Sequence, residues 1–293
     1  MLSLHTNAAS LSAQNSLSST QSKLSTSMTR LSTGFRINSA SDDAAGLQIA
    51  TRLKSQTSGM AVAMRNTQNS VSMLQTAEGA LDEVTNIMTR MKDLATQAAD
   101  ASSSAADQTA MQKEYDSLTD ELSNIFSNTK FGGTALLSKT GKLSSATGID
   151  FQIGADSSEK MNGNFKVELI DTVHVNILAA ATGFKPDGTA PPAAVRTELT
   201  ATANATIDLL ATAIDDVSAL RSKIGAVSNR LDHVYNNLSN VSTNTQAATG
   251  RIMDVDFASE SAKMTSNQML MQAGTAMLKQ TNQMSSMVMS LLQ

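Results

Sequence analysis

The stretch from Val217 to Val241, VSALRSKIGAVSNRLDHVYNNLSNV, carries the most regular pattern in the chain. Its apolar residues form two series of seven-residue spacing, offset by three: Val217, Ile224, Leu231 and Leu238, and Leu220, Val227, Val234 and Val241. A seam of this kind, sustained over about four heptads, is typical of a helix that packs along a partner helix. We expect one helix from about residue 195 to about residue 249, roughly 80 Å long at about 1.5 Å per residue.

Long helices are also favoured elsewhere. All three prolines, Pro186, Pro191 and Pro192, lie in one short stretch, so the arms on either side of it are free of helix-breaking residues. Apolar residues at helical spacing predict helices over about residues 43–100 and 105–128. The fold class expected from these patterns is mainly α.

Breaks between the helices are predicted from local sequence. Gly34 and the Asn/Ser/Asp run after it end the first helix, and Ser41 or Asp42 is the expected N-cap of the next one. Gly250 is expected to interrupt the last long helix.

A small β element is predicted after Gly132-Gly133, where the apolar period changes to two. The alternating positions are Ile149, Phe151 and Ile153, followed by Phe165, Val167 and Leu169. We therefore expect two short antiparallel strands separated by a turn-rich segment.

The two ends of the chain carry few charges and have apolar residues at heptad spacing. Leu17, Leu24 and Leu31 are seven residues apart, and so are Leu270, Met277, Met284 and Leu291. Helices with so few charges on their surface depend on packing for stability, so both ends are expected to find partner helices.

Several function classes are disfavoured by composition. A net charge of -4 gives no polycation for nucleic acid, and no window approaches the length of apolar sequence that spans a membrane. The first residues lack the pattern of a cleavable secretory signal. The chain has no Cys, and His5, His174 and His233 are isolated, so we expect no metal, no cofactor and no catalytic site.

Motifs near both ends resemble those of bacterial flagellins. At the N-terminal side they are residues 30–40 (RLSTGFRINSA), 42–49 (DDAAGLQI) and 75–81 (QTAEGAL). At the C-terminal side they are residues 225–231 (GAVSNRL), 272–278 (QAGTAML) and 290–293 (SLLQ). The resemblance covers roughly residues 1–170 and 200–293, in the same order as in the family.

The resemblance implies an architecture: a long antiparallel coiled-coil or helical-bundle rod with the terminal helices paired in an inner domain. Residues 1–42 and 253–293 would form this terminal domain, and residues 43–175 and 197–252 the long-helix domain with its β element. Residues 176–196 would be a short variable outer loop, in place of the large outer domains of longer flagellins.

It also implies a function, a structural subunit that self-polymerises into the flagellar filament used for motility. The chain would form an open helical homopolymer, leave the cell without a cleaved signal, and meet an export chaperone on its C-terminal helix. Filament cap and hook-junction proteins would be further partners. The polymerisation contacts expected are Leu11, Leu17, Leu24, Met28, Leu31, Leu270, Met277, Met284, Val288 and Leu291.

A further implied partner is the animal Toll-like receptor for flagellin, at Arg90, Leu94 and Glu114. The alternative for these residues is that Leu94 packs in the helix seam and Arg90 is a solvated charge. For the whole chain, the alternatives are a hook–filament junction protein and a coiled-coil translocator or adhesin. An enzyme is the least favoured class.

Overall fold

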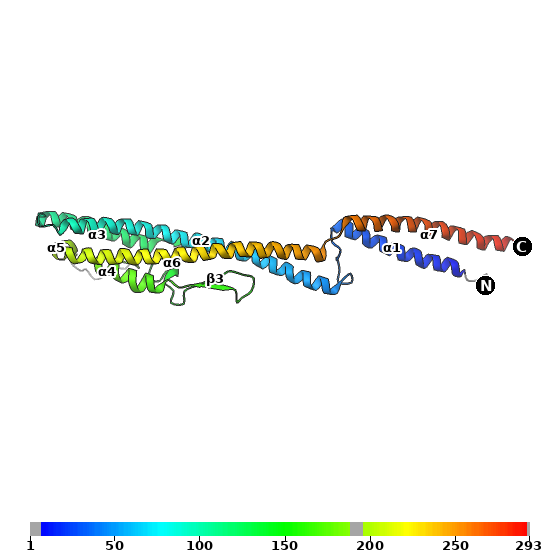
Figure 1. Ribbon diagram of the computed structural model, residues 1–293, viewed down its shortest axis with the longest axis horizontal. Helices are drawn as coiled ribbons and strands as arrows, with labels where there is room; N and C mark the ends of the chain where they lie inside the picture. Colours follow the sequence, from blue (N-terminus) through cyan, green and yellow to red (C-terminus); the bar gives the residue numbers. More distant parts are fainter. Residues whose placement is uncertain (1–6, 188–195, 292–293) are drawn as a thin grey trace. The chain divides into compact units, whose positions relative to one another are not determined.

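The computed structural model describes residues 7–187 and 196–291 of the 293-residue chain, with side chains to residue 284. The mainly α prediction is confirmed (Figure 1). The long helices are α1 (Ala8–Thr33), α2 (Ala44–Ala98), α3 (Ala105–Asn128), α6 (Ala203–Met253) and α7 (Phe257–Leu291). Shorter elements are a π-helix at Val167–His174, α4 (Val175–Ala180), α5 (Glu198–Ala201) and a 3₁₀ turn at Lys142–Ser144.

The described residues form two compact units. One contains those up to residue 57 together with those from residue 243, and the other contains residues 58–242. The first is called the terminal unit below, and the second the long-helix unit. The predicted domain limits at residues 42 and 253 stay a prediction.

The long-helix unit is built on the predicted seam. Val217, Ile224 and Leu231 are almost completely buried, as are Leu74 and Leu81 of α2. The side chain of Arg221 crosses from α6 to α2, where its Nη2 lies 2.8 Å from Glu78 Oε1 and 2.9 Å from Asp82 Oδ1. The seam weakens toward the end of α6, where the side chain of Val241 is exposed.

Helix α3 begins and ends where the sequence predicted. Ser104 is its N-cap: its hydroxyl accepts the N–H of Asp107, and the Asp107 carboxylate accepts the N–H of Ser104. This reciprocal pair satisfies two backbone donors that the first helical turn leaves unpaired. The Ser104 hydroxyl and N–H also hold the pKa of the Asp107 carboxyl below its usual value.

The β element is smaller than predicted. Strand β3 (Ile149–Gln152) pairs antiparallel with β4 (Lys160–Gly163), with Phe151 opposite Met161. Strands β1 (Lys130–Phe131) and β2 (Thr134–Ala135) form a second ladder around Gly132 and Gly133, whose φ angles are +56° and +81°. Such angles favour glycine, because a Cβ would strain the turn.

The predicted strand over residues 165–169 is wrong, because this segment is helical. Phe165, Leu169, Val173 and Ile177 are buried at four-residue intervals, while Val167 is exposed. Three residues spaced by two satisfy an alternating pattern, but the burial continues with helical spacing through the π-helix into α4.

Four other boundaries differ from prediction. The N-cap of α2 is Asp43, whose Oδ1 accepts the N–H of Gly46 at 2.8 Å, whereas Asp42 Oδ2 accepts the N–H of Asn38 and Ser39. Gly250 does not interrupt α6, which continues to Met253. The long helix of the second arm begins at Ala203, after the separate α5.

The fourth difference is the predicted outer loop. Its first residues form α4, and its residues 188–195 lie outside the described residues. Behind α4, His174 is buried with its ring edge-on to Phe126 and Phe184, at centroid distances of 5.2 and 6.0 Å. Tyr115 donates its hydroxyl to the carbonyl of Ala180 at 2.8 Å. This segment is therefore part of the core.

Candidate functional site

Helices α1 and α7 of the terminal unit lie side by side and antiparallel (Figure 1). Near one end of the pair, Ser27 donates its hydroxyl to Glu260 Oε1 at 2.6 Å. Near the other end, the Ser10 hydroxyl donates to Asn282 Oδ1 at 3.3 Å. Between them a Cβ on Gly274 would lie 3.3 Å from Leu17 Cδ1, so the glycine lets the helices approach closely.

The contact seam of α1 is the heptad series expected from sequence. Leu24 is buried, and Leu17 and Leu31 are half-buried. The residues of α1 that alternate with them at the seam are small or polar: Ala13, Thr20 and Ser27. Leucines on one line and small side chains on the other form the seam that faces α7.

The contact seam of α7 differs from the expected series. It contains Glu260, Met264, Asn267, Met271, Gly274, Leu278 and Thr281, which are buried or half-buried at alternating spacings of four and three residues. Leu270, Met277 and Met284 lie outside this seam, with 57%, 62% and 56% of their surfaces exposed. The series that includes Leu270, Met277 and Met284, expected among the polymerisation contacts, therefore does not form the seam with α1: α7 carries two apolar lines, and this series is the outer one.

Two residues of α1 also lie outside the seam. Leu11 and Met28 are both 55% exposed, and Met269 of α7 is 60% exposed. Val288 and Leu291 lie where side chains are not described. The terminal unit thus has an internal seam and, separate from it, exposed apolar residues on both helices.

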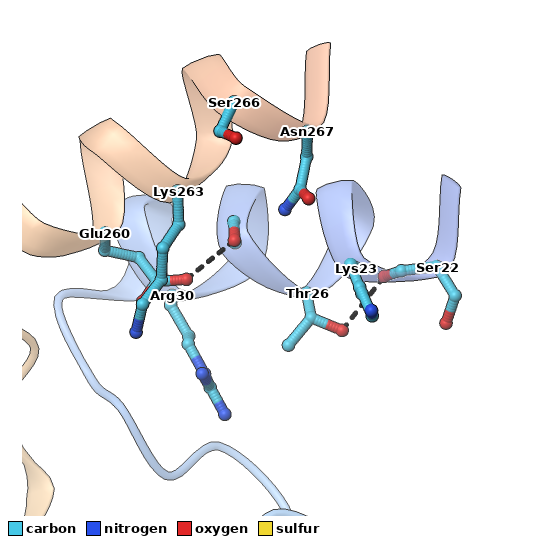
Figure 2. A pocket seen from close by; sticks show the side chains of 9 residues that line it. Ser22, Lys23, Thr26, Arg30, Glu260, Lys263, Ser266 and Asn267 are labelled. Carbon is cyan, nitrogen blue, oxygen red and sulfur yellow. Dashed lines mark hydrogen bonds and ion pairs between the residues drawn. The ribbon is translucent and has the colours of Figure 1, made fainter. Parts of the chain in front are cut away.

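A polar cavity of about 370 Å³ lies between the two helices near Glu260 (Figure 2). It is lined by Ser22, Lys23, Thr26, Ser27, Arg30, Glu260, Lys263, Ser266 and Asn267. The Glu260 carboxylate is almost fully buried, where Ser27 donates to one oxygen and Lys263 Nζ lies 3.6 Å from the other. The buried carboxylate fixes the register of α7 against α1, because a shifted register would remove the Ser27 hydroxyl, its donor from α1.

Glu260 was not among the residues predicted from sequence to have a role at this end of the chain. A signal was present, since Glu260 is the single acidic residue among the last 37 residues of the chain, 257–293. A lone acid on a helix otherwise kept almost free of charge indicates a specific partner.

The segments that connect the terminal helices to the long ones are tied together by backbone. Gly34 ends α1 at a φ of +76° and accepts the N–H of Val255 at 3.0 Å. Arg36 donates its N–H to Met253 and its guanidinium to the carbonyl of Ile252 at 2.8 Å. Asp256 then receives the N–H of Ala258, and hydrogen bonds led by the Ser259 hydroxyl hold its pKa below the usual value.

The three residues expected to contact a receptor are placed differently from one another. Arg90 and Glu114 are half exposed and form an ion pair, with Arg90 Nη2 2.6 Å from Glu114 Oε1. Leu94 is 2% exposed and lies in the core of the long-helix unit.

The described residues contain no group of three or more His, Cys, Asp or Glu side chains placed to hold a metal ion. Within the same residues, no helix has the length and hydropathy needed to cross a membrane.

Comparison with known proteins identifies the family. The bacterial flagellin N-terminal helical region matches residues 4–142, and the bacterial flagellin C-terminal helical region matches residues 207–292. The chain is 37% identical to a flagellin of Bacillus subtilis, covering 99% of both chains, and 33% identical to polar flagellin C of Vibrio parahaemolyticus, covering all of both. A solved structure, that of Bacillus cereus flagellin, is 34% identical, has a TM-score of 0.47 and is matched over 63% of this chain and 94% of that one. The chain therefore belongs to the bacterial flagellin family, the structural subunits of the extracellular flagellar filament used for motility.

Proposed function

We propose that subunits of this flagellin join through the outward apolar residues of α1 and α7. The observation that supports this is the exposure of Leu270, Met277 and Met284 on α7 and of Leu11 and Met28 on α1. Isolated exposed apolar side chains are normal on protein surfaces, but seven-residue repetition along one helix is typical of a surface that another helix covers.

The internal seam and the outward line have different roles in this proposal. The seam, with Leu24 buried and Glu260 held by Ser27, sets how α1 and α7 of one subunit fit together. The exposed apolar residues supply contacts to neighbouring subunits. They are called the outward line below and are Leu11, Met28, Met269, Leu270, Met277 and Met284. Such contacts join different surfaces of two copies, so subunits add head to tail in an open helix and do not close into a ring.

Assembly and folding of the ends are coupled in this proposal. Ordering each residue costs about 1–2 kcal/mol of backbone entropy. In the isolated subunit each terminal helix packs against one partner and keeps an apolar line in water. The ends are therefore ordered fully when neighbouring subunits cover that line, and an end that is unfolded before assembly suits passage through a narrow export channel.

Deletion tests this proposal directly. We expect protein lacking residues 1–30 or residues 265–293 to stay monomeric when filament fragments are added as seeds, while full-length protein elongates them. Sedimentation and electron microscopy measure the polymer, and circular dichroism of each truncated protein checks that the long-helix unit is folded. Equal elongation by either truncated protein would overturn the proposal.

The same outward face of α7 is proposed as the site for the export chaperone, because a chaperone that covers it keeps monomers apart. Replacing Leu270 and Met277 by serine is expected to weaken chaperone binding, measured by calorimetry, whereas Met264→Ser in the seam serves as the control. Unchanged chaperone affinity in the double variant would refute this. Filament cap and hook-junction proteins are proposed to meet the terminal helices at the two ends of the filament.

Export is proposed to occur without cleavage of a signal peptide. The intact mass of subunits dissociated from isolated filaments tests this, since the chain should retain its N-terminal residues. The loss of a segment of 15 residues or more, about the length of a signal peptide, would contradict it.

Receptor recognition is proposed at the exposed pair Arg90 and Glu114. Leu94 is buried, so its part would be to support α2 beneath them. We expect Arg90→Ala and Glu114→Ala to reduce signalling by a cell line that carries the receptor. Arg52→Ala, on the same helix, is the control. A signalling response that is unchanged in both variants would contradict receptor recognition at this pair.

We also infer that the chain's role is structural and includes no catalysis. No hydrolytic or transfer activity is expected of purified filaments, and turnover that survives repeated repolymerisation of the protein would contradict this.

A further inference from the structure

The methionines whose side chains are described range from fully buried to largely exposed. Six lie in the core of the long-helix unit: Met60, Met73, Met88, Met91, Met111 and Met161. Among the described residues, four are exposed by more than half of their surface: Met28, Met269, Met277 and Met284. All four exposed methionines are on α1 or α7, and none is in the long-helix unit.

Exposure makes a thioether reactive, since oxidants reach sulfur through solvent. The four exposed methionines have 55%, 60%, 62% and 56% of their surfaces in water. Met264 and Met271, which occupy the seam against α1, are half-buried. The fold therefore presents its accessible sulfur atoms on the surface that the proposed assembly needs to be apolar.

We propose that Met28, Met269, Met277 and Met284 are oxidation sites through which peroxides block assembly of the subunit. This inference rests on the proposed function of the outward face. A lone pair of the sulfur attacks a peroxide oxygen, the O–O bond breaks, an S–O bond forms and water leaves. Sulfur loses two electrons and the peroxide gains them, so that each methionine consumes one hydrogen peroxide and becomes a sulfoxide.

Oxidation weakens subunit association because it makes the methionine side chain polar. A sulfoxide is a strong hydrogen-bond acceptor on a side chain that was apolar, and burying it without a donor opposes association. The side chains that repeat at seven-residue spacing along the outward line of α7, Leu270, Met277 and Met284, carry no hydrogen-bond donor, and after Glu260 the only charged residues of the chain are Lys263 and Lys279. An oxidised subunit should therefore remain monomeric.

The assembled filament should behave differently. When neighbouring subunits cover the outward line, the same four sulfur atoms lose their access to solvent. Oxidation thus acts on subunits that have not yet been added, and the filament already built is resistant. Because sulfoxides are reversible by methionine sulfoxide reductases, the block is reversible as well.

The experiment compares full-length monomer with and without hydrogen peroxide, which is removed by catalase before filament seeds are added. We expect peptide mapping to show oxidation of the four methionines with Met88 and Met91 intact, and the critical concentration to rise about tenfold or more. Treatment with methionine sulfoxide reductase should restore elongation. Normal elongation by protein oxidised at these four sites, or no recovery after reduction, would overturn the inference.

A matched pair of variants assigns the effect to the outward line. Leucine has nearly the volume of methionine and no reactive sulfur. Protein with leucine at positions 28, 269, 277 and 284 should elongate seeds after peroxide treatment, whereas Met264→Leu with Met271→Leu should remain sensitive. Equal loss of elongation in the fourfold variant would refute the assignment.

The same experiment tests the proposed function separately, through untreated monomer and through assembled filaments. Untreated wild-type monomer that does not elongate seeds, or filaments whose four methionines oxidise as fast as those of monomer, would contradict the outward face as an interface. The oxidation step in the monomer is judged separately, by peptide mapping.

Discussion

Replacing Leu270, Met277 and Met284 by alanine, singly and together, measures how much the outward line of α7 contributes to assembly. Their exposed fractions are 57%, 62% and 56%, so slightly more than half of each side chain is left to be buried by a neighbour. Complete burial of such a side chain is worth about 1.5–3 kcal/mol. The remaining portion, less what alanine keeps, comes to about 1 kcal/mol for each position.

This magnitude sets the expected shift in critical concentration. A loss of about 1 kcal/mol raises the dissociation constant for subunit addition about fivefold, and three such losses raise it on the order of 100-fold if they add. The assay is sedimentation of polymer at a series of monomer concentrations with constant seed. Leu178→Ala is the control, because Leu178 of α4 is also exposed but lies in the long-helix unit.

The reasoning is refuted if the triple variant has the critical concentration of the wild type, or if Leu178→Ala raises it as much. If the circular dichroism spectrum shows that the triple variant is misfolded, the critical concentrations of the three single variants decide the test. These change one exposed side chain each and leave the internal seam intact.

Three other predictions concern the interior. Leu231→Ala, at a fully buried position, should lower the free energy of unfolding in urea by about 2–5 kcal/mol, and Leu238→Ala, half-buried on the same line, by less; equal losses would contradict the described seam. Burial lowers the pKa of His174 from 6.5 to about 4, so protonation favours the unfolded chain and stability should fall by about 3 kcal/mol as pH decreases from 6.5 to 4. In urea titrations His174→Gln should show a smaller decrease, and an identical pH profile would exclude this histidine as the cause. Ser27→Ala leaves the buried Glu260 carboxylate without its hydroxyl donor and should weaken seeded elongation, whereas an unchanged rate would show that the register does not depend on this bond.

Much of the helical structure follows from the sequence alone. Absence of proline from both arms and sustained heptads are local properties, and α3 begins at the predicted residue because Ser104 and Asp107 cap its first turn with their own side chains. Gly34 ends α1 as expected, since its positive φ is readily adopted by glycine. The family resemblance likewise depends on short motifs that need no coordinates.

Only the tertiary structure decided which apolar line of α7 faces its partner helix. Helix α7 has two heptad series, one through Met264, Met271 and Leu278 and one through Leu270, Met277 and Met284, and periodicity cannot rank them. The first is buried because Glu260 and Gly274 lie on the same face, where one is held by Ser27 and the other admits Leu17. Sequence periodicity was also ambiguous at Phe165 and Leu169. Their spacing fits a strand, but the burial of Val173 and Ile177 continues it as a helix. Periodicity is a property of one segment, whereas the choice of face depends on what a distant segment supplies.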